Sequence, residues 1–225
     1  YHPAANYFTG LIYKANKDEI NALESFGLAA RSMEYRSVAY VQMAEIKATQ
    51  NDWKEAVFYA NKSLEFNQHQ LSALKILSVN ARKSNKLSSA KQLWKKIQNI
   101  DALDDFSRFE QYLVNPTKIQ KTAFTKNIQN EFPYQTYLEL ASEYLKLGLK
   151  EDAIKVLDMS PQHDLVAIWK AYLNESTSAL DQIKNETPYF IFPFRSEDVE
   201  VLNWAIDHND HWTFKYYLGL VYWHL

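Results

Sequence analysis

The chain contains no cysteine and only four glycines among its 225 residues. Without cysteine it has neither a disulfide bond nor a thiolate metal ligand, and four scattered glycines do not make a glycine-rich phosphate loop. Long apolar runs are missing too, since residues 165–169 and 189–194 fall far short of the ~20 residues that a membrane-spanning helix needs. These absences argue against nucleotide-binding and membrane-spanning proteins.

An excess of charge of one sign is also missing. The chain carries 25 basic and 27 acidic residues, and the formal net charge is −2, so no overall field attracts it to nucleic acid or to a membrane. Catalytic motifs of the G-x-S-x-G and H-E-x-x-H types do not occur. The paired carboxylates Asp104 and Asp105 lie at a predicted helix start, where capping explains them. We expect no enzymatic activity, no cofactor, and neither a nucleic-acid nor a membrane partner.

What the sequence does contain is a repeat. Ala22, Ala56 and Ala90 are 34 residues apart, and a fixed period in this range indicates stacked supersecondary units. We interpret each unit as two antiparallel helices, with small residues where the two backbones approach closely. Ala22, Ala56 and Ala153 are therefore predicted to be buried between paired helices. If the alanine is position 20 of the unit, position 8 is also small in each copy: Gly10, Ala44 and Ser78.

The turn inside each unit is predicted near position 15. Lys17, Asn51 and Asn85 occupy this position, and asparagine tolerates the left-handed conformation that ends many helices. Asp18 and Asp52 follow directly, where they can cap the second helix of the pair.

These features resemble the tetratricopeptide repeat. The resemblance implies an all-α fold, a right-handed superhelical array of antiparallel helix pairs. The proline that the family usually has at position 32 is replaced by Glu34, Gln68 and Ala102. The residues that carry the resemblance are Gly10, Tyr13, Ala22, Phe26 and Ala29 in the first copy, Tyr137, Leu140, Ala141, Tyr144, Gly148, Ala153, Ile154 and Leu157 in a later copy, and Leu218, Gly219 and Tyr222 in a final half copy.

A second resemblance covers most of the chain. The strings AARSMEYRSVAYVQMAEI, YQTYLELASEYLKLGLKEDAIKVLD and PYFIFPFRSEDVEVLNWA are similar to the helical-repeat region of large bacterial proteins. Those proteins also carry a β-rich domain similar to sugar-mutarotase folds, with no assigned function. The resemblance implies that this chain is part of a longer protein, an expectation that also fits its first residue, Tyr1.

We expect a single helical-repeat domain over residues 1–225. A shortened unit fills the gap after the third copy, and its second helix is predicted to bury Ile119, Ala123, Phe124 and Ile128. Residues 188–194 include two prolines, Pro188 and Pro193, and are predicted to be an extended segment over helix ends, followed by a helix capped by Ser196. The predicted units are 3–36, 37–70, 71–104, a degenerate unit 105–133, 134–161, an irregular unit 162–211 and a half repeat 212–225.

Candidate binding residues follow from the family resemblance, which places certain positions of each first helix on a concave groove. A clamp for a peptide's terminal carboxylate needs asparagine at position 9, where this chain has Leu11, Glu45 and Val79, so that clamp is not expected. A solvated basic face and a groove for acidic peptides are the two interpretations of the remaining pattern. The candidate groove residues are Tyr7, Leu11, Lys14, Val41, Glu45, Lys75, Val79, Arg82 and Lys83.

Two further features have competing interpretations. Arg195 precedes a predicted helix and could contact an anion there, or it could tie the loop to a neighbouring carbonyl or carboxylate. The cluster of His208, Asp210, His211 and His224 could supply metal ligands, but a polar loop explains it as well, so no metal is expected.

We therefore expect a non-catalytic protein-interaction or intramolecular scaffolding module. Its partner would be a protein, a peptide or another domain of the same protein. The alternative is an accessory region of a carbohydrate-active or sugar-binding bacterial protein, whose aromatic side chains contact glycan. The protein is expected to be soluble, cytoplasmic or periplasmic. Self-association through the C-terminal helix is also expected, because helical spacing there leaves apolar side chains partly bare: Phe214, Tyr217, Leu218, Val221 and Tyr222.

Overall fold

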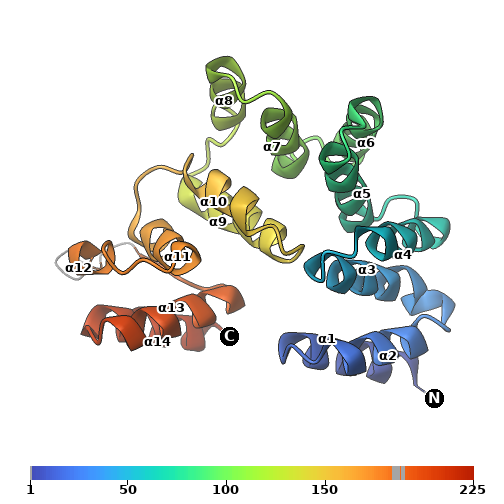
Figure 1. Ribbon diagram of the computed structural model, residues 1–225. Coiled ribbons are helices and arrows are strands. Elements are labelled where there is room, and N and C mark those ends of the chain that lie inside the picture. Colours follow the sequence, from blue (N-terminus) through green and yellow to red (C-terminus); the bar gives the residue numbers. More distant parts are fainter. Residues whose placement is uncertain (1, 184–187, 189–190) are drawn as a thin grey trace. The chain divides into compact units, whose positions relative to one another are not determined.

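The computed structural model describes residues 2–183, 188 and 191–225, and all its regular elements are α-helices. The chain divides into two compact units (Figure 1). Unit 1 comprises residues 1–127 and 146–149, and unit 2 comprises residues 128–145 and 150–225. That they form one repeat domain over residues 1–225 stays a prediction.

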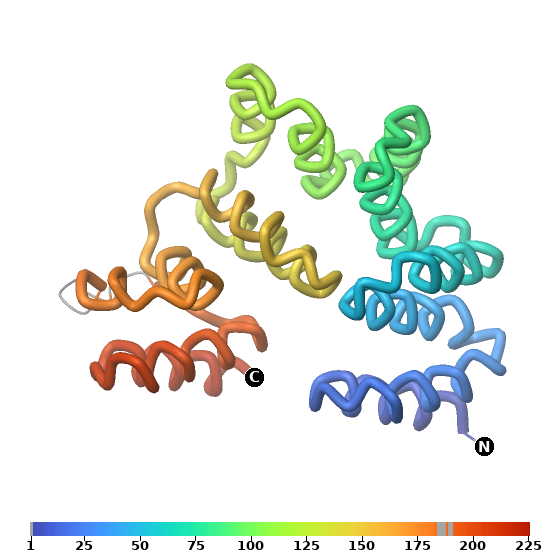
Figure 2. The backbone as a smooth tube through the Cα atoms, in the orientation of Figure 1, coloured from blue at the N-terminus to red at the C-terminus, as the bar shows by residue number. Residues whose placement is uncertain are grey.

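Unit 1 is a series of helix pairs joined by short turns. Neighbouring members pack against each other, α1 on α2, α3 on α4, and α5 on α6, and α7 contacts α5, α6 and α8. Figure 2 traces the tight turn inside each of these pairs. The helices are α1 (Pro3–Ala15), α2 (Glu19–Ala29), α3 (Met33–Thr49), α4 (Trp53–Phe66), α5 (Leu71–Lys83), α6 (Leu87–Ile100), α7 (Asp105–Val114) and α8 (Lys118–Thr125).

Unit 2 is less regular. The helix α9 packs on α10, α13 packs on α14, and α11 contacts α10, α12 and α13. The helices are α9 (Pro133–Leu145), α10 (Lys150–Leu157), α11 (Asp164–Asn174), α12 (Leu180–Ile183), α13 (Ser196–His208) and α14 (Trp212–His224). The described part of the chain is thus an all-helical array of neighbouring pairs, compatible with a helical repeat.

The predicted turn at position 15 is confirmed. Lys17, Asn51 and Asn85 have φ of 61°, 59° and 55°, and Gly148, at the same position of a later copy, has φ of 71°. In the first three copies the next residue's N–H donates to a carbonyl five residues earlier, for example Asp18 N to Tyr13 O at 2.9 Å. This bond closes the end of the first helix, so the same local geometry ends the first helix of each pair.

The predicted start of the second helix, directly after the turn, is confirmed for the first two copies. Asp18 Oδ1 accepts a hydrogen bond from Asn21 N at 3.3 Å, and Asp52 Oδ1 accepts one from Glu55 N at 3.1 Å. Each carboxylate satisfies an N–H that the helix itself leaves without a partner.

Small residues lie where the paired helices meet. Ala22, Ala56 and Ala153 are fully buried, as predicted, and so is Ala90. At Gly10 an added Cβ would lie 2.7 Å from the Phe26 ring, so glycine is needed for the close approach of α1 and α2. The first two pairs share one core, formed by Ala22, Phe26, Ala29, Ala30, Ala39, Met43 and Ile46 with half-buried tyrosines around it.

We predict that Ala56→Leu lowers the free energy of unfolding by about 1–3 kcal/mol, because the fully buried site has no room for three more carbon atoms. Urea titration of the parent and the variant measures the difference. Ala123→Leu, an exposed alanine in a helix of the same unit, is the control and should change stability little. Equal denaturation midpoints for Ala56→Leu and the parent would contradict the packing described here.

The shortened unit and the segment before α13 differ from the predictions. In α8 only Phe124 is buried, on Phe109 at a ring distance of 5.3 Å, while Ile119 and Ala123 are exposed. Ile128 is buried as predicted, but it lies beyond the end of this helix at Thr125. The predicted extended segment falls partly on residues 189–190, which lie outside the described residues. Ile191 and Pro193 in that segment are buried.

The helix α13 begins one residue earlier than the predicted cap implies. Arg195, and not Ser196, is its N-cap residue. The Arg195 N–H donates to Asp198 Oδ2 at 3.0 Å, and Trp169 Nε1 donates to the other oxygen of the same buried carboxylate at 2.8 Å. Asp198 therefore decides where the helix starts, and burial raises its pKa.

Candidate functional site

The candidate groove cations are used in contacts between successive helix pairs of unit 1. Lys14 on α1 forms an ion pair with Glu45 on α3 and donates to Gln42 Oε1 at 2.7 Å. Arg82 on α5 pairs with the fully buried Glu110 on α7 at 2.9 Å. In both cases a cation on one first helix meets a carboxylate on the next, so these side chains connect the repeats.

The other two candidate lysines are also engaged. Lys75 pairs with Asp104 at 2.9 Å and lies 5.1 Å from the centroid of the Phe106 ring. Lys83 lies 4.7 Å from the centroid of the Trp53 ring, within the range of a cation–π contact.

The uncharged candidates belong largely to the core. Val41 and Val79 are buried and present no surface to a ligand. Tyr7 and Leu11 are half-buried against the core of the first two pairs, where burial, and then Glu45, raises the pKa of the Tyr7 hydroxyl. Of the nine candidates, the structure brings Lys14 and Glu45 into direct contact.

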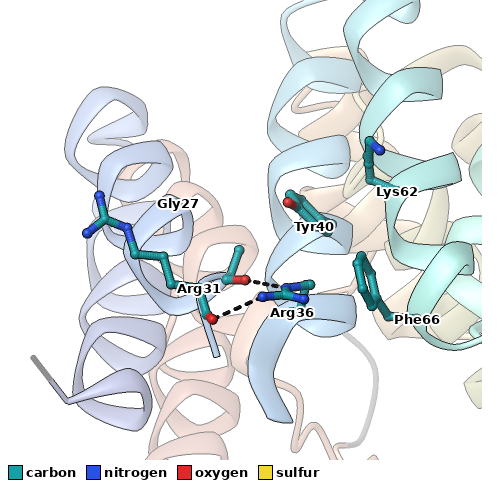
Figure 3. Close-up of a pocket in the computed structure, with 7 residues that line it drawn as sticks. Gly27, Arg31, Arg36, Tyr40, Lys62 and Phe66 are labelled. Carbon is teal, nitrogen blue, oxygen red and sulfur yellow. Dashed lines mark hydrogen bonds between the residues drawn. The ribbon is translucent and has the colours of Figure 1, made fainter. Parts of the chain in front are cut away.

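A pocket of about 380 Å³ lies elsewhere in unit 1, lined by the end of α2, the first turns of α3 and the last turns of α4 (Figure 3). It opens to solvent and none of the nine candidate residues lines it. Three cations and two aromatic rings dominate its walls, and no acidic side chain is among the lining residues, which are Gly27, Ala30, Arg31, Arg36, Tyr40, Lys62 and Phe66.

Arg36 forms a fixed wall of this pocket. Its Nε donates to Ala30 O at 2.8 Å and its Nη2 donates to Arg31 O at 3.0 Å, as Figure 3 shows. These carbonyls belong to the end of α2, where the helix dipole favours positive charge. The guanidinium also lies 4.7 Å from the Phe66 ring centroid. Arg36 is therefore held in place before any ligand arrives.

The other two cations are at the exposed rim. The side chain of Arg31 is exposed and points away from the carbonyls that Arg36 binds (Figure 3). Lys62 bonds both oxygens of Glu65 at 3.0 and 3.1 Å on the surface of α4. An exposed i,i+3 pair of this kind contributes little to stability, so a ligand carboxylate can replace Glu65 at low cost.

The walls on α3 and α4 are joined by a buried pair of serines. Ser37, next to Arg36, and Ser63, next to Lys62, lie with their Oγ atoms 2.9 Å apart. Ser63 Oγ is also 2.9 Å from Ser37 O. On the pocket side, Tyr40 stacks on Phe66 at a ring distance of 6.3 Å. These contacts make the aromatic floor a rigid part of the α3–α4 pair.

Comparisons with known proteins do not add a family to this picture. No protein-family profile matches the chain, and a search of curated proteins finds no match. The candidate site therefore depends on its geometry alone.

The residue pattern alone did not predict this pocket, and it contains only a weak indication of it, two pairs of a cation and an aromatic residue. Arg36 with Tyr40, and Lys62 with Phe66, each place a cation and an aromatic ring four residues apart on one helix face. The two helix faces meet only through the packing of α3 on α4, which the residue pattern does not specify.

In unit 2, Arg195 has a bonding partner within the same unit. Its guanidinium donates to the Gln135 side chain and to Gln135 O, the latter at 3.0 Å, and burial lowers its pKa. It also lies 4.5 Å from the Phe194 ring centroid. These bonds correspond to the predicted tie between the loop and a neighbouring carbonyl.

The histidines near the C-terminus have separate neighbours. The His208 ring lies tilted against the Trp204 ring with centroids 4.5 Å apart, His211 Nδ1 is 3.0 Å from Thr213 Oγ1, and His224 contacts Phe194. Among the residues that the structure describes, no three His, Asp or Glu side chains are grouped as metal ligands would be. None of the described helices is both long and apolar enough to span a membrane.

His163 is the strongly perturbed histidine of the described chain. Its Nδ1 accepts a hydrogen bond from Leu165 N at 3.2 Å and so caps α11, and its ring stacks on Tyr134 with centroids 3.4 Å apart. Burial lowers the pKa of His163 from 6.5 to about 4. The cap requires the neutral ring, because a protonated Nδ1 cannot accept.

We predict a pH-dependent loss of stability from this residue. Because the folded-state pKa lies below the unfolded value, the unfolded chain takes up the proton first, and stability falls as the pH drops from about 6.5 towards about 4. After allowance for screening at the half-exposed ring, the loss is about 1–2 kcal/mol. Urea titrations at pH 7 and pH 4.5 should show a smaller difference for His163→Asn than for the parent. His69→Asn, at an exposed histidine, is the control, and an unchanged difference for His163→Asn would contradict the prediction.

The C-terminal helix differs in part from the prediction for it. Phe214, Tyr217 and Val221 are buried, because this face of α14 packs on α13. Of the five residues predicted to be partly bare, Tyr222 is the exposed one and Leu218 is half-buried. The bare aromatic surface is instead formed mainly by other residues of the same helix: Trp212, Tyr216 and Trp223, the last 87% exposed.

Proposed function

We propose that this chain is a non-catalytic protein-interaction module that holds a partner at the pocket of unit 1. The observation that carries the proposal is the lining of that pocket, with three cations and two aromatic rings, and neither a histidine nor a carboxylate. Such a set can bind and orient a partner group, but it lacks the usual base and nucleophile pair. The partner is a protein, a peptide or another domain of the same protein.

The proposal includes the tetratricopeptide type of the repeats. It is supported by the 34-residue recurrence of the left-handed residue at positions 17, 51 and 85 and of the buried alanines. We also propose that the chain is the helical-repeat region of a larger bacterial protein with a sugar-mutarotase-like domain, acting in the cytoplasm or the periplasm.

Site-specific photocrosslinking tests the interaction. Phe66 lines the pocket and Phe58 lies on the same helix outside it, and both rings are exposed. Each phenylalanine is replaced by p-benzoylphenylalanine in cells that produce the protein. We expect a discrete crosslinked protein from position 66 that is missing from position 58 and is lost in an Arg31→Glu background. Identical patterns from both positions, or no crosslinked protein from position 66, would refute the proposal.

A second candidate function is favoured by the exposed aromatics of α14. Trp212 and Trp223 present more than half of their surface to solvent, and exposed indole rings can stack on sugar rings or on a second copy of the helix. Affinity electrophoresis in gels that contain polysaccharides tests the glycan interpretation, and sedimentation at increasing protein concentration tests self-association. Trp223→Ser should abolish the retardation by polysaccharide or the self-association, whichever of these is observed. A monomer that no polysaccharide retards would eliminate this candidate.

A further inference from the structure

The chemistry of the pocket specifies what kind of partner segment it takes. We infer that it binds an acidic peptide segment in which a carboxylate and an apolar ring are neighbours. This inference rests on the proposed interaction function and adds to it the class of ligand and the part that each wall has in binding.

Charge complementarity gives the first argument. Arg31, Arg36 and Lys62 line one small pocket, and the acidic residues nearest to them in sequence, Glu34 and Glu65, are exposed and outside the lining. No carboxylate lines the pocket beside these cations, so an anion that enters it is attracted to them. Since the whole chain has a net charge of −2, the positive charge is local and matches a short acidic segment better than an extended polyanion.

The roles of the cations differ. Arg36 already donates to two helix-end carbonyls and lies on Phe66, so it supplies a fixed positive field. Arg31 is exposed, and its planar guanidinium can donate two parallel hydrogen bonds to a carboxylate. Lys62 can exchange Glu65 for the ligand. Arg31 and Lys62 are therefore the direct contacts, one from the turn after α2 and one from α4.

The aromatic floor gives the second argument. The Tyr40 ring stacks on Phe66, and both side chains line the pocket, where Phe66 is 41% exposed. A free inorganic anion would leave these rings in water, whereas a peptide with an apolar ring beside its carboxylate covers them. The volume of about 380 Å³ lies in the range of small-ligand pockets and accommodates such a side chain.

Gly27 provides a way to fill the pocket. It lines the cavity from α2, and an added Cβ there would have no atom within 4 Å. Leucine at this position extends into the open space without a clash at Cβ, and it favours the helix more than glycine does. Gly219 on α14 is a matched control, since it is also helical with no atom within 4 Å of an added Cβ and does not line the pocket.

The test is titration of the ¹⁵N-labelled protein with blocked pentapeptides. The probe is Glu-Asp-Phe-Glu-Asp, with Gln-Asn-Phe-Gln-Asn, Glu-Asp-Gly-Glu-Asp and inorganic phosphate as comparison ligands. We expect the probe to shift the amide signals of residues 27, 30, 31 and 36. The neutral and ring-free peptides should bind about tenfold more weakly or less. Binding of the probe should weaken between about 50 mM and about 500 mM NaCl.

Substitutions in and away from the pocket test whether the probe binds there. Arg31→Glu, Lys62→Glu and Gly27→Leu should each raise the dissociation constant about tenfold or more. Lys96→Glu, an exposed lysine on α6, and Gly219→Leu should leave it unchanged. Thermal melts of every variant confirm that it is folded.

Several results would overturn the inference. They are a probe that does not bind, a neutral peptide or phosphate that binds as tightly as the probe, and equal binding by Gly27→Leu and Gly219→Leu. If a protein is crosslinked from position 66 and any of these results is also obtained, the proposed interaction function stands and the acidic ligand is refuted. If the probe binds at the pocket but no protein is crosslinked, the inferred ligand class stands and the proposed interaction function is refuted.

Discussion

Replacing Glu110 with alanine should lower the free energy of unfolding of unit 1 by about 3–5 kcal/mol. Glu110 is fully buried on α7, and its Oε2 accepts a hydrogen bond from Arg82 Nε at 2.9 Å. Removal of one partner leaves the other charge largely desolvated, which costs more than the ion pair contributes when intact. Because Arg82 keeps 15% of its side chain exposed, the lower part of the range is expected. Urea titration measures the change.

Two further variants test whether the loss of stability comes from leaving one charge buried without its partner. Glu65→Ala removes the exposed partner of Lys62 and should change stability by less than about 0.5 kcal/mol. The double variant Arg82→Met/Glu110→Leu replaces both charges with apolar groups and should recover most of the loss, because no charge is left buried. A Glu110→Ala variant as stable as Glu65→Ala would mean that the pair does not connect α5 and α7.

Phe26→Ala should also cost about 3–5 kcal/mol. The Phe26 ring is fully buried between α1 and α2, lies 5.7 Å from the Tyr7 ring, and is in the space left by Gly10. Its removal leaves a cavity in the core that the first two helix pairs share. Phe58→Ala, at an exposed ring, is the control and should cost far less.

Gly10→Ala tests whether the contributions of Gly10 and of the Phe26 ring to stability are coupled. In the parent, the added methyl would lie 2.7 Å from the Phe26 ring, so the variant should lose about 1–3 kcal/mol. In the Phe26→Ala background the same methyl has room, and the helix propensity of alanine should make the change neutral or stabilising. Additive effects in the double variant would contradict the close contact described here.

Local features of this fold could be predicted because they depend on residues close together in the sequence. The left-handed residue that ends a first helix, the aspartate that caps the next helix, and the buried alanine of each pair are specified within about ten residues. Lys17, Asp18 and Ala22 show all three in one copy. The 34-residue recurrence then identified each helix pair of the first three copies.

Contacts between helix pairs could not be predicted, because they depend on lateral packing over about thirty residues. Lys14 and Arg82 were expected on an open groove, but the structure pairs them with Glu45 and Glu110 of the following first helices. The candidate pocket arises in the same way, since Arg31, Arg36 and Lys62 line one pocket only when α2, α3 and α4 are packed together.

The face of a helix that becomes buried was likewise decided by its neighbours. In α14 nearly every side is apolar or aromatic, so helical periodicity could not choose between Tyr217 and Trp223 as the core residue. Packing on α13 buries Tyr217 and leaves Trp223 exposed. The sequence by itself thus determined the helix pairs of the regular copies, the turn inside each pair and the aspartate caps of the first two copies. Only the tertiary structure decided which charges are neutralised within the chain and which cations and aromatic rings stay available to a partner, because burial and ion pairing depend on which helices pack together.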